Sequence, residues 1–321
     1  MKLTLLIATL ALAMNTEAAE WERLAPLPEP NGGFIAGVAG EQIVVIGGTN
    51  WKEDTKHWLK GIHAYDPKLN SWRETGRLDA PLAYAAVGQD AGTLWFASGS
   101  TGTETQRSIW KIDAGFSVTR AWTLDEGIVL AGSALIGPAL YVLGGTDDMN
   151  HLEHVTNAFR AIDLRDGGTT KLPEYPGPAF MIGASAACGA RFFVFGGARW
   201  DTAAGDVANF SSAHAFDTAT KRWEKLAPFP YAVRGLCAVA LDERRILLAG
   251  GYKNNAEEFT DAVFVFDTST GKYTATQPLP YKGMPSLVKL GDWLYCIAGE
   301  DRKKHRTDAV FRIQWKELLP R

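Results

Sequence analysis

Short apolar segments that end in small residues recur along the chain. The first consists of Val44, Val45 and Ile46 and is followed by Gly47 and Gly48. Continuous apolar runs bounded by glycine are typical of strands that are buried on both faces. Segments of the same kind end at Gly48, Gly99, Gly145, Gly197, Gly251 and Gly299. The pattern therefore predicts six equivalent buried strands.

The residues between these segments predict the rest of each repeat. In the first repeat, residues 62–66 alternate in polarity and are followed by a turn at residues 67–70 and by Trp72. The fourth repeat has the same order of strand, turn and tryptophan. Successive final glycines are 46 to 54 residues apart, and one Gly-Gly pair in a unit of about 50 residues is the signature of a kelch blade. We therefore expect an all-β chain that forms one domain, a six-bladed kelch β-propeller.

The two ends of the chain predict how the propeller closes. The sixth repeat stops soon after its third predicted strand, at residues 309–313. Residues 21–28, Trp-Glu-Arg-Leu-Ala-Pro-Leu-Pro, match the fourth-strand segment at residues 223–230, Trp-Glu-Lys-Leu-Ala-Pro-Phe-Pro. We therefore expect the N-terminal strand to close the last blade, where it covers a sheet edge that otherwise promotes aggregation.

The first residues resemble an export signal. Lys2 is followed by an apolar run at residues 3–14 and by a segment that ends in Ala18 and Ala19, which is the order of a signal peptide. The apolar run is shorter than the roughly 20 residues that a membrane-spanning helix needs, and no cysteine for lipid attachment stands at the expected cut. We expect a signal peptide at residues 1–18, a propeller at 19–321 and no membrane anchor. The mature protein is expected in the periplasm, or outside a cell that has no outer membrane.

Charge and cysteine content narrow the possible partners. The chain has 33 basic and 36 acidic residues and a formal net charge of −3. It lacks the basic excess that nucleic-acid binding requires, so nucleic acid is not an expected partner. The cysteines, Cys188, Cys237 and Cys296, stand in apolar stretches, and an odd number cannot pair completely. We expect buried free thiols.

One face of the predicted propeller collects most of the loops that could form a site. In a four-stranded meander, the loops after the second and fourth strands open on the same face, and ligand sites favour such concave mouths. The loops after the second strands begin at Thr49, Ser100, Thr146, Ala198, Tyr252 and Glu300, and the segments that lead into the first strands lie around Asn31, Ala83, Phe180, Arg234 and Met284. We expect the functional residues on this mouth face.

Blades five and six differ at two positions of the mouth face. Both contain the sequence Thr-Asp-Ala-Val-Phe, which indicates equivalent strands. Around this shared sequence, Tyr252 and Phe259 of blade five are replaced by Glu300 and Arg306 of blade six. A carboxylate and a guanidinium at a mouth could transfer protons and bind an anion. A structural salt bridge across the loop is the alternative, because ion-pair networks also produce such pairs.

Residues 299–311 resemble a stretch of the N-acetylneuraminate epimerase family, the exported sialic acid mutarotases. The family has Gly-Glu followed by Arg-Thr-Asp-Ala-Val-Phe, and its proposed active-site Glu and Arg correspond to Glu300 and Arg306. The family continues into a Trp-x-x-Leu-Ala-Pro segment and a Gly-Gly-Phe strand, which here stand at residues 21–26 and 32–34, at the other end of the chain. The chain therefore resembles a cyclically permuted branch of the mutarotases.

The resemblance implies an isomerase that interconverts the α and β anomers of N-acetylneuraminate, a small-molecule sugar substrate, without a metal or another cofactor. Glu300 would be the acid/base for ring opening, and Arg306 would bind the sugar carboxylate through paired hydrogen bonds. The family's long loop insertion has no counterpart, since no interval between repeats exceeds 54 residues, so substrate enclosure is expected to differ. Further candidates for substrate contacts lie on the mouth face: Arg234, Arg199, Asn31 and Trp51.

A non-catalytic kelch module is an alternative function. It would bind a glycan or a protein through aromatic residues at the mouth, because exposed aromatics mark interfaces. The aromatic residues available there are Trp51, Trp58, Trp200 and Tyr252.

A copper radical oxidase is a further alternative, because galactose oxidase also contains a kelch propeller. Such chemistry needs His and Tyr ligands and a Cys that is linked to a Tyr. His151 and His154 share a mouth loop with Glu153, but the three cysteines lie in strand segments. Imidazole ligands need convergent partners, and the sequence displays none, so we expect no metal site.

Overall fold

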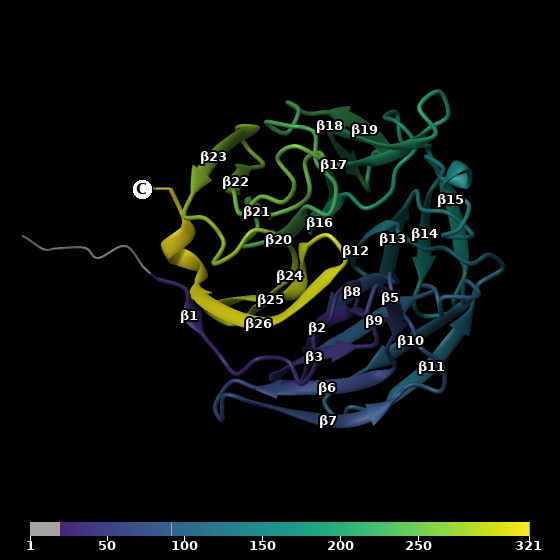
Figure 1. Cartoon of the computed structure of the whole chain (residues 1–321). Coiled ribbons are helices and arrows are strands. Elements are labelled where there is room, and N and C mark those ends of the chain that lie inside the picture. Colours follow the sequence, from purple (N-terminus) through teal and green to yellow (C-terminus); the bar gives the residue numbers. More distant parts are fainter. Residues whose placement is uncertain (1–19, 91, 321) are drawn as a thin grey trace, which may run out of the picture.

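Six antiparallel sheets, each of four strands, surround a common axis (Figure 1). A computed structural model describes residues 20–90 and 92–320 of the chain. The predicted all-β, six-bladed propeller is confirmed, whereas the predicted signal peptide at residues 1–18 lies outside the described residues. Helical structure in the described part is limited to the 3₁₀ turns η1 (Leu152–His154) and η2 (Trp315–Leu318). None of the described helices has the length and apolar character needed to cross a bilayer.

The strands of each blade follow one another from the axis outward, and blade six takes its outer strand from the N-terminal end of the chain. Blade one contains β2 (Ile35–Ala39), β3 (Gln42–Ile46), β6 (Gly61–Asp66) and β7 (Ser71–Arg77), and blade two contains β8 (Ala86–Asp90), β9 (Thr93–Ala97), β10 (Ser108–Ile112) and β11 (Val118–Thr123). Blade three contains β12 (Gly132–Ile136), β13 (Ala139–Leu143), β14 (Phe159–Asp163) and β15 (Thr169–Leu172), and blade four contains β16 (Ala184–Cys188), β17 (Arg191–Asp201), β18 (Asp206–Asp217) and β19 (Arg222–Lys225). Blade five contains β20 (Cys237–Ala240), β21 (Arg245–Ala249), β22 (Val263–Asp267) and β23 (Lys272–Thr276), and blade six contains β24 (Met284–Leu290), β25 (Trp293–Arg302), β26 (His305–Gln314) and β1 (Glu22–Arg23).

The continuous apolar runs are the second strands of the blades, and packing on both faces explains their composition. In β3, Ile43 and Val45 belong to the hydrophobic cluster that blade one shares with blade six. Val44 and Ile46, which point to the opposite face, belong to the cluster shared with blade two. Because successive side chains of a strand alternate between faces, every position of such a strand must be apolar.

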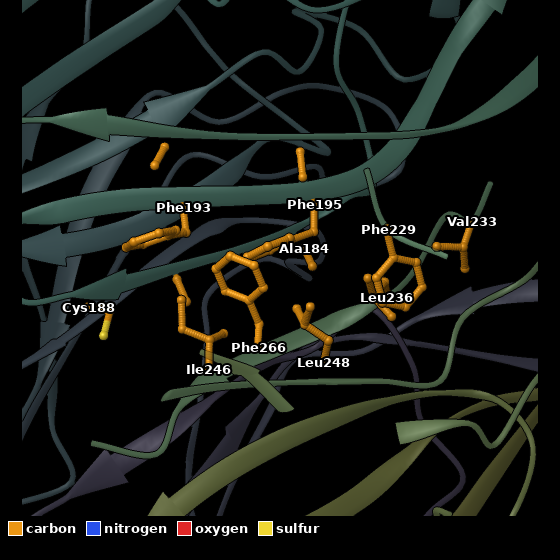
Figure 2. Close-up of a cluster of buried hydrophobic side chains, with 13 residues drawn as sticks. Ala184, Cys188, Phe193, Phe195, Phe229, Val233, Leu236, Ile246, Leu248 and Phe266 are labelled. Carbon is orange, nitrogen blue, oxygen red and sulfur yellow. The ribbon is translucent and has the colours of Figure 1, made fainter. Parts of the chain in front are cut away.

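The hydrophobic core is therefore divided into clusters between neighbouring blades. Figure 2 shows the cluster between blades four and five, where Phe193 and Phe195 of β17 face Ile246 and Leu248 of β21 and Phe266 of β22. The rings of Phe195 and Phe266 have centroids 5.1 Å apart and meet edge to face, an arrangement that aromatic quadrupoles favour. Each blade is thus held by its neighbours as well as by its own hydrogen bonds.

The N-terminal strand completes the last blade, as predicted. Strand β1 pairs with β26 in the register Glu22 to Arg312, and the two strands lie side by side in Figure 1. Beyond the strand, the amide of Leu24 donates to the carbonyl oxygen of Val310 at 2.9 Å. Nε of Arg312 donates to Oε2 of Glu22 at 2.7 Å. The ring of blades is therefore closed by contacts between residues nearly 300 positions apart.

The predicted mouth loops lie next to the segments that lead into the first strands. In each of the first five blades, an isolated β-bridge joins the two, as Gly32 pairs with Thr49 and Arg234 pairs with Tyr252. A hairpin of β4 (Thr49–Lys52) and β5 (Thr55–Trp58) forms the mouth loop of blade one. Its tip reaches the β25–β26 hairpin of blade six, where Nζ of Lys304 lies 3.0 Å from Oδ1 of Asp54.

The three cysteines are free and lie in strands, as predicted. Cys188 and Cys296 are buried, and Cys237 is partly exposed as a residue. Burial nevertheless raises the pKa of the Cys237 thiol to about 12, and burial also raises the pKa values of Cys188 and Cys296. These thiols are therefore protonated at neutral pH and weakly nucleophilic.

Candidate active site

A cavity of about 890 Å³ opens on the mouth face, and all six blades contribute to its lining. The chain as a whole has a net charge of −3, but five cations and two carboxylates line this cavity. Clefts lined by one sign of charge concentrate the opposite charge, so the cavity favours an anionic ligand. The charged lining residues are Lys56, Arg234, Lys253, Lys303, Arg306, Asp206 and Glu300.

A ring of residues with left-handed backbone conformation surrounds the axis within this cavity. Their φ angles lie between 51° and 68°, and each stands immediately after the residue that bridges to the mouth loop. The amide of each later residue donates to the carbonyl oxygen of the corresponding residue in the preceding blade. The amide of Tyr84 donates to Gly33 at 2.8 Å, and the amide of Gly235 donates to Ile182 at 2.6 Å. We call this set the central ring: Gly33, Tyr84, Leu130, Ile182 and Gly235.

Interblade hydrogen bonds hold the central ring in a conformation that its side chains disfavour. Left-handed backbone costs about 1 to 3 kcal/mol at a residue other than glycine, and the cost is greatest for a β-branched residue such as Ile182. Glycine is required at the first position, because a Cβ atom on Gly33 would lie 2.3 Å from Cε1 of Tyr84. Blade six has Pro285 at the equivalent place, which has no N–H to extend the series.

Glu300 and Arg306 lie opposite each other in β25 and β26, and both line the cavity. Tyr252 and Phe259 form the equivalent bridge of blade five, with ring centroids 5.2 Å apart. The predicted replacement of an aromatic pair by an opposite-charge pair is therefore present at the mouth. Nη1 of Arg306 forms an ion pair with Oε2 of Glu300. The salt bridge that the sequence offered as the alternative to a role in proton transfer and anion binding is therefore present, and it lies at the mouth.

The guanidinium of Arg306 retains an unused hydrogen-bond donor. Its side chain is only 6% exposed, and Nε has no hydrogen-bond acceptor among the described residues. Nη1 is in contact with Oε2 of Glu300, whose carboxylate neutralises the charge of the guanidinium. Buried donors without acceptors are unfavourable, so a ligand that supplies acceptor oxygens would stabilise this group.

Gly32 leaves the space that the Arg306 side chain occupies. A Cβ atom at this position would lie 2.5 Å from both Cδ and Nε of Arg306. Real side chains do not approach so closely, so any residue larger than glycine would displace the guanidinium. Gly32 therefore positions Arg306 at the cavity wall.

Arg234 is fixed in another part of the same wall. Its Nη1 donates to Oδ1 of Asn209 at 3.0 Å, and its guanidinium carbon lies 4.3 Å from the ring centroid of Tyr252. Asn209 is itself held, because its Nδ2 donates to the carbonyl oxygens of Tyr252 and Lys253 at 2.9 and 2.6 Å. Burial lowers the pKa of Arg234, and Glu300 is among the acidic groups that oppose this shift.

Tyr84 and Lys56 also line the cavity, although no pattern in the sequence had indicated them. Lys56 belongs to β5, and its Nζ lies 4.8 Å from the ring centroid of Tyr84. The place of Tyr84 in the repeat could have identified it. Tyr84 follows the bridging residue of blade two, Ala83, and Gly33 has the equivalent place in blade one. A large residue at a position that needs left-handed backbone is unusual.

The other predicted contact residues have different surroundings. Trp51 lines the cavity, and its buried Nε1 has no hydrogen-bond partner among the described residues. Asn31 and Arg199 are not among the lining residues. Nδ2 of Asn31 donates to the carbonyl oxygen of Gly47 at 2.8 Å, and Nη2 of Arg199 lies 3.0 Å from Oδ2 of Asp201. Four of the six predicted site residues therefore meet at the cavity, whereas Asn31 and Arg199 do not line it.

His151, Glu153 and His154 cluster in the loop between β13 and β14. Their potential ligand atoms lie within 4.8 Å of one another, and all three residues are exposed. Nδ1 of His151 lies 2.9 Å from Oε1 of Glu153, and Nδ1 of His154 lies 3.1 Å from Oδ1 of Asp147. The hydrogen bond with Glu153 raises the pKa of His151. None of these side chains lines the cavity, and the expected absence of a metal site stays a prediction.

Comparison with known proteins identifies the repeat. Residues 33–78 match the model of the Kelch motif. Blade one carries a kelch motif. The matched residues run from the central ring at Gly33 through the outer strand β7. The chain is thus a six-bladed propeller with a kelch motif in blade one.

Two groups of relatives share distant similarity with this chain. Kelch-like protein 35 of Mus musculus is 25% identical over 283 residues, which are 84% of this chain and 44% of the relative. N-acetylneuraminate epimerase of Vibrio vulnificus is 29% identical over 135 residues, 40% of this chain and 33% of the relative. The protein of that name from Brucella melitensis is 35% identical over 105 residues, 26% of each chain. The chain thus spans less than half the length of these relatives.

Proposed function

We propose that this chain is an isomerase that interconverts the α and β anomers of N-acetylneuraminate. The observation that carries the proposal is the pair of Glu300 and Arg306, a carboxylate beside a buried guanidinium whose Nε is an unused donor, in a cavity rich in cations. Relatives that are named N-acetylneuraminate epimerase support the same substrate. Export of the mature protein, as expected from residues 1–18, is part of this proposal.

The reaction needs one proton removed and another supplied. The anomeric carbon of N-acetylneuraminate carries a hydroxyl, the ring oxygen and a carboxylate. Ring opening removes the hydroxyl proton and protonates the ring oxygen, and closure on the opposite face of the resulting ketone gives the other anomer. The Glu300 carboxylate accepts the hydroxyl proton and returns it after closure, which is general acid–base catalysis.

The arginines bind the sugar carboxylate. A guanidinium forms two parallel hydrogen bonds with a carboxylate and so fixes its orientation as well as its position. Nε of Arg306 is available for such a bond, and Arg234 is held in place by Asn209 and Tyr252. Because the sugar carboxylate is attached to the anomeric carbon, its binding brings the reacting atoms to the carboxylate beside Arg306.

The direct test follows anomer exchange by proton NMR. N-acetylneuraminate released as the α anomer relaxes to an equilibrium that is mainly β, and added protein should increase the rate of this relaxation. Heat-denatured protein at the same concentration serves as the control. If native protein leaves the relaxation at its rate in buffer, the isomerase proposal is wrong for this sugar.

The Gly32→Ala variant should weaken this activity without removing any functional group. The added methyl group displaces the Arg306 side chain, and misplacing a binding group by about 1 Å can cost roughly 10²-fold in rate. We expect kcat/KM for anomer exchange to fall by about tenfold or more. Gly76→Ala is the matched control, because its Cβ would meet only Cδ1 of Ile62, at 3.6 Å. Equal kcat/KM for both variants would show that Gly32 does not position Arg306.

A non-catalytic sugar-binding module is the second candidate. The unpartnered indole N–H of Trp51 favours it, because such a group could donate to a sugar hydroxyl or amide. In that case N-acetylneuraminate would bind, as followed by titration calorimetry, while the rate of anomer exchange remained at its value in buffer.

A further inference from the structure

Tyr84 is the one member of the central ring whose side chain carries a polar group. The ring fixes its backbone through two hydrogen bonds, from its amide to Gly33 and from the amide of Leu130 to its carbonyl oxygen. We propose, on the basis of the function proposed above, that Tyr84 is a second catalytic residue, which donates a proton to the sugar ring oxygen while Glu300 accepts the proton of the anomeric hydroxyl.

The phenol is held against the cavity from several directions. The ring of Trp58 meets the ring of Tyr84 edge to face, with centroids 5.9 Å apart. The Tyr84 hydroxyl lies 3.3 Å from Oγ1 of Thr49, and this threonine also donates to the carbonyl oxygen of Gly32 at 3.1 Å. Gly33 lies directly against the phenol ring. Such contacts give a reacting group the fixed position that catalysis needs.

Tyr84 is close to the pair of Glu300 and Arg306. A side chain on Gly32 would collide with Arg306, and one on the next residue, Gly33, would collide with Tyr84. Since consecutive α-carbons are about 3.8 Å apart, the phenol and the guanidinium lie against adjacent residues of the same segment. Tyr84, Glu300 and Arg306 all line the cavity, so one sugar ring can contact a donor and an acceptor.

The electrostatic surroundings favour proton donation by this phenol. Burial on its own raises the pKa of Tyr84, but the positive charges of Lys56 and Arg306 outweigh burial, and the resulting pKa lies below the ordinary value. The same charges stabilise the phenolate that forms when the proton leaves. The carboxylate of Glu300 is paired with Arg306 and lines the same cavity.

The proposed step conserves atoms and protons. As the bond between the anomeric carbon and the ring oxygen breaks, the Tyr84 phenol gives its proton to that oxygen. The anomeric hydroxyl becomes a carbonyl and gives its proton to Glu300. On closure the new hydroxyl attacks the other face of the carbonyl and returns a proton to the Tyr84 phenolate, while Glu300 reprotonates the anomeric oxygen. No oxidant, reductant or cofactor is consumed.

The test compares Tyr84→Phe with wild type by NMR exchange measurements across a range of pH. We expect kcat to fall roughly 10²-fold, the lower end of the range for general acid–base catalysis, with KM little changed. In wild type, the protein-dependent rate should decline as alkaline pH removes the phenol proton, below the ordinary tyrosine pKa of about 10, and this decline should be absent from Tyr84→Phe. Tyr175→Phe is the matched control, because it also loses one buried hydroxyl contact, to Ser212 at 3.1 Å, away from the cavity.

The possible results distinguish the role of Tyr84 from the proposed isomerase activity. Wild-type activity that survives unchanged in Tyr84→Phe would overturn the role of Tyr84 and leave the isomerase proposal standing. A lower rate that keeps the alkaline decline would also overturn it, because the residue would then be structural. An inactive wild-type protein would overturn both proposals.

Discussion

The Glu300→Gln variant is expected to retain roughly one hundredth or less of the wild-type acceleration of anomer exchange. Glutamine keeps the shape of the side chain and an oxygen atom that can face Arg306, but its amide cannot accept and return a proton. General acid–base catalysis typically contributes 10² to 10⁴-fold, so this substitution removes most of the proposed chemistry. Proton NMR exchange rates at a fixed concentration of N-acetylneuraminate provide the measurement.

Glu224→Gln is the matched control for this prediction. Glu224 of β19 also forms an ion pair with an arginine of its own sheet, Arg191 of β17, but neither residue lines the cavity. This control should exchange anomers at the wild-type rate. If the glutamine variant folds poorly, the Glu300→Asp variant replaces it in this test. Aspartate keeps the charge beside Arg306, and this variant should exchange anomers at an intermediate rate. A Glu300→Gln protein with wild-type melting and wild-type exchange would identify the pair as a purely structural salt bridge.

The blades could be predicted from the sequence because one packing requirement is repeated six times. A second strand such as β3 faces a neighbouring blade on each side, so adjacent residues such as Val44 and Val45 must both be apolar. Closure could be predicted for the same reason, because Leu24 and Leu27 have the positions of residues 226 and 229 in the matching segment of blade four. Patterns that repeat along one chain need no second sequence to be recognised.

The pairing at the site could be predicted because strand register determines which residues meet. Glu300 and Arg306 face each other because the shared Thr-Asp-Ala-Val-Phe sequence sets the register of β25 and β26. Arg199 and Asn31 show the limit of such reasoning, since a position in a mouth loop does not determine where a side chain points. Tyr84 was missed because its place depends on hydrogen bonds between blades, which connect residues far apart in the sequence.

Removal of residues 20–28 is expected to cause a large loss of stability, and aggregation. Two buried leucines are lost with β1, since Leu24 and Leu27 are 5% and 4% exposed, and burial of two leucines is worth about 3 to 6 kcal/mol. Backbone hydrogen bonds to Val310 and Asp308 are lost as well. Because whole domains are stable by only about 5 to 15 kcal/mol, this segment supplies a considerable share.

Thermal melting and size-exclusion chromatography test this prediction, with a protein that begins at residue 20 as the matched parent. The shortened chain should melt at a much lower temperature and form larger species, because the free edge of β26 can pair with other molecules. A synthetic peptide of residues 20–28 should restore melting when it is added in excess, since the segment is held by noncovalent contacts and a bound ligand stabilises the folded state by mass action. Equal melting temperatures and a single monodisperse peak for the shortened and parent proteins would mean that the N-terminal strand does not close the propeller in solution.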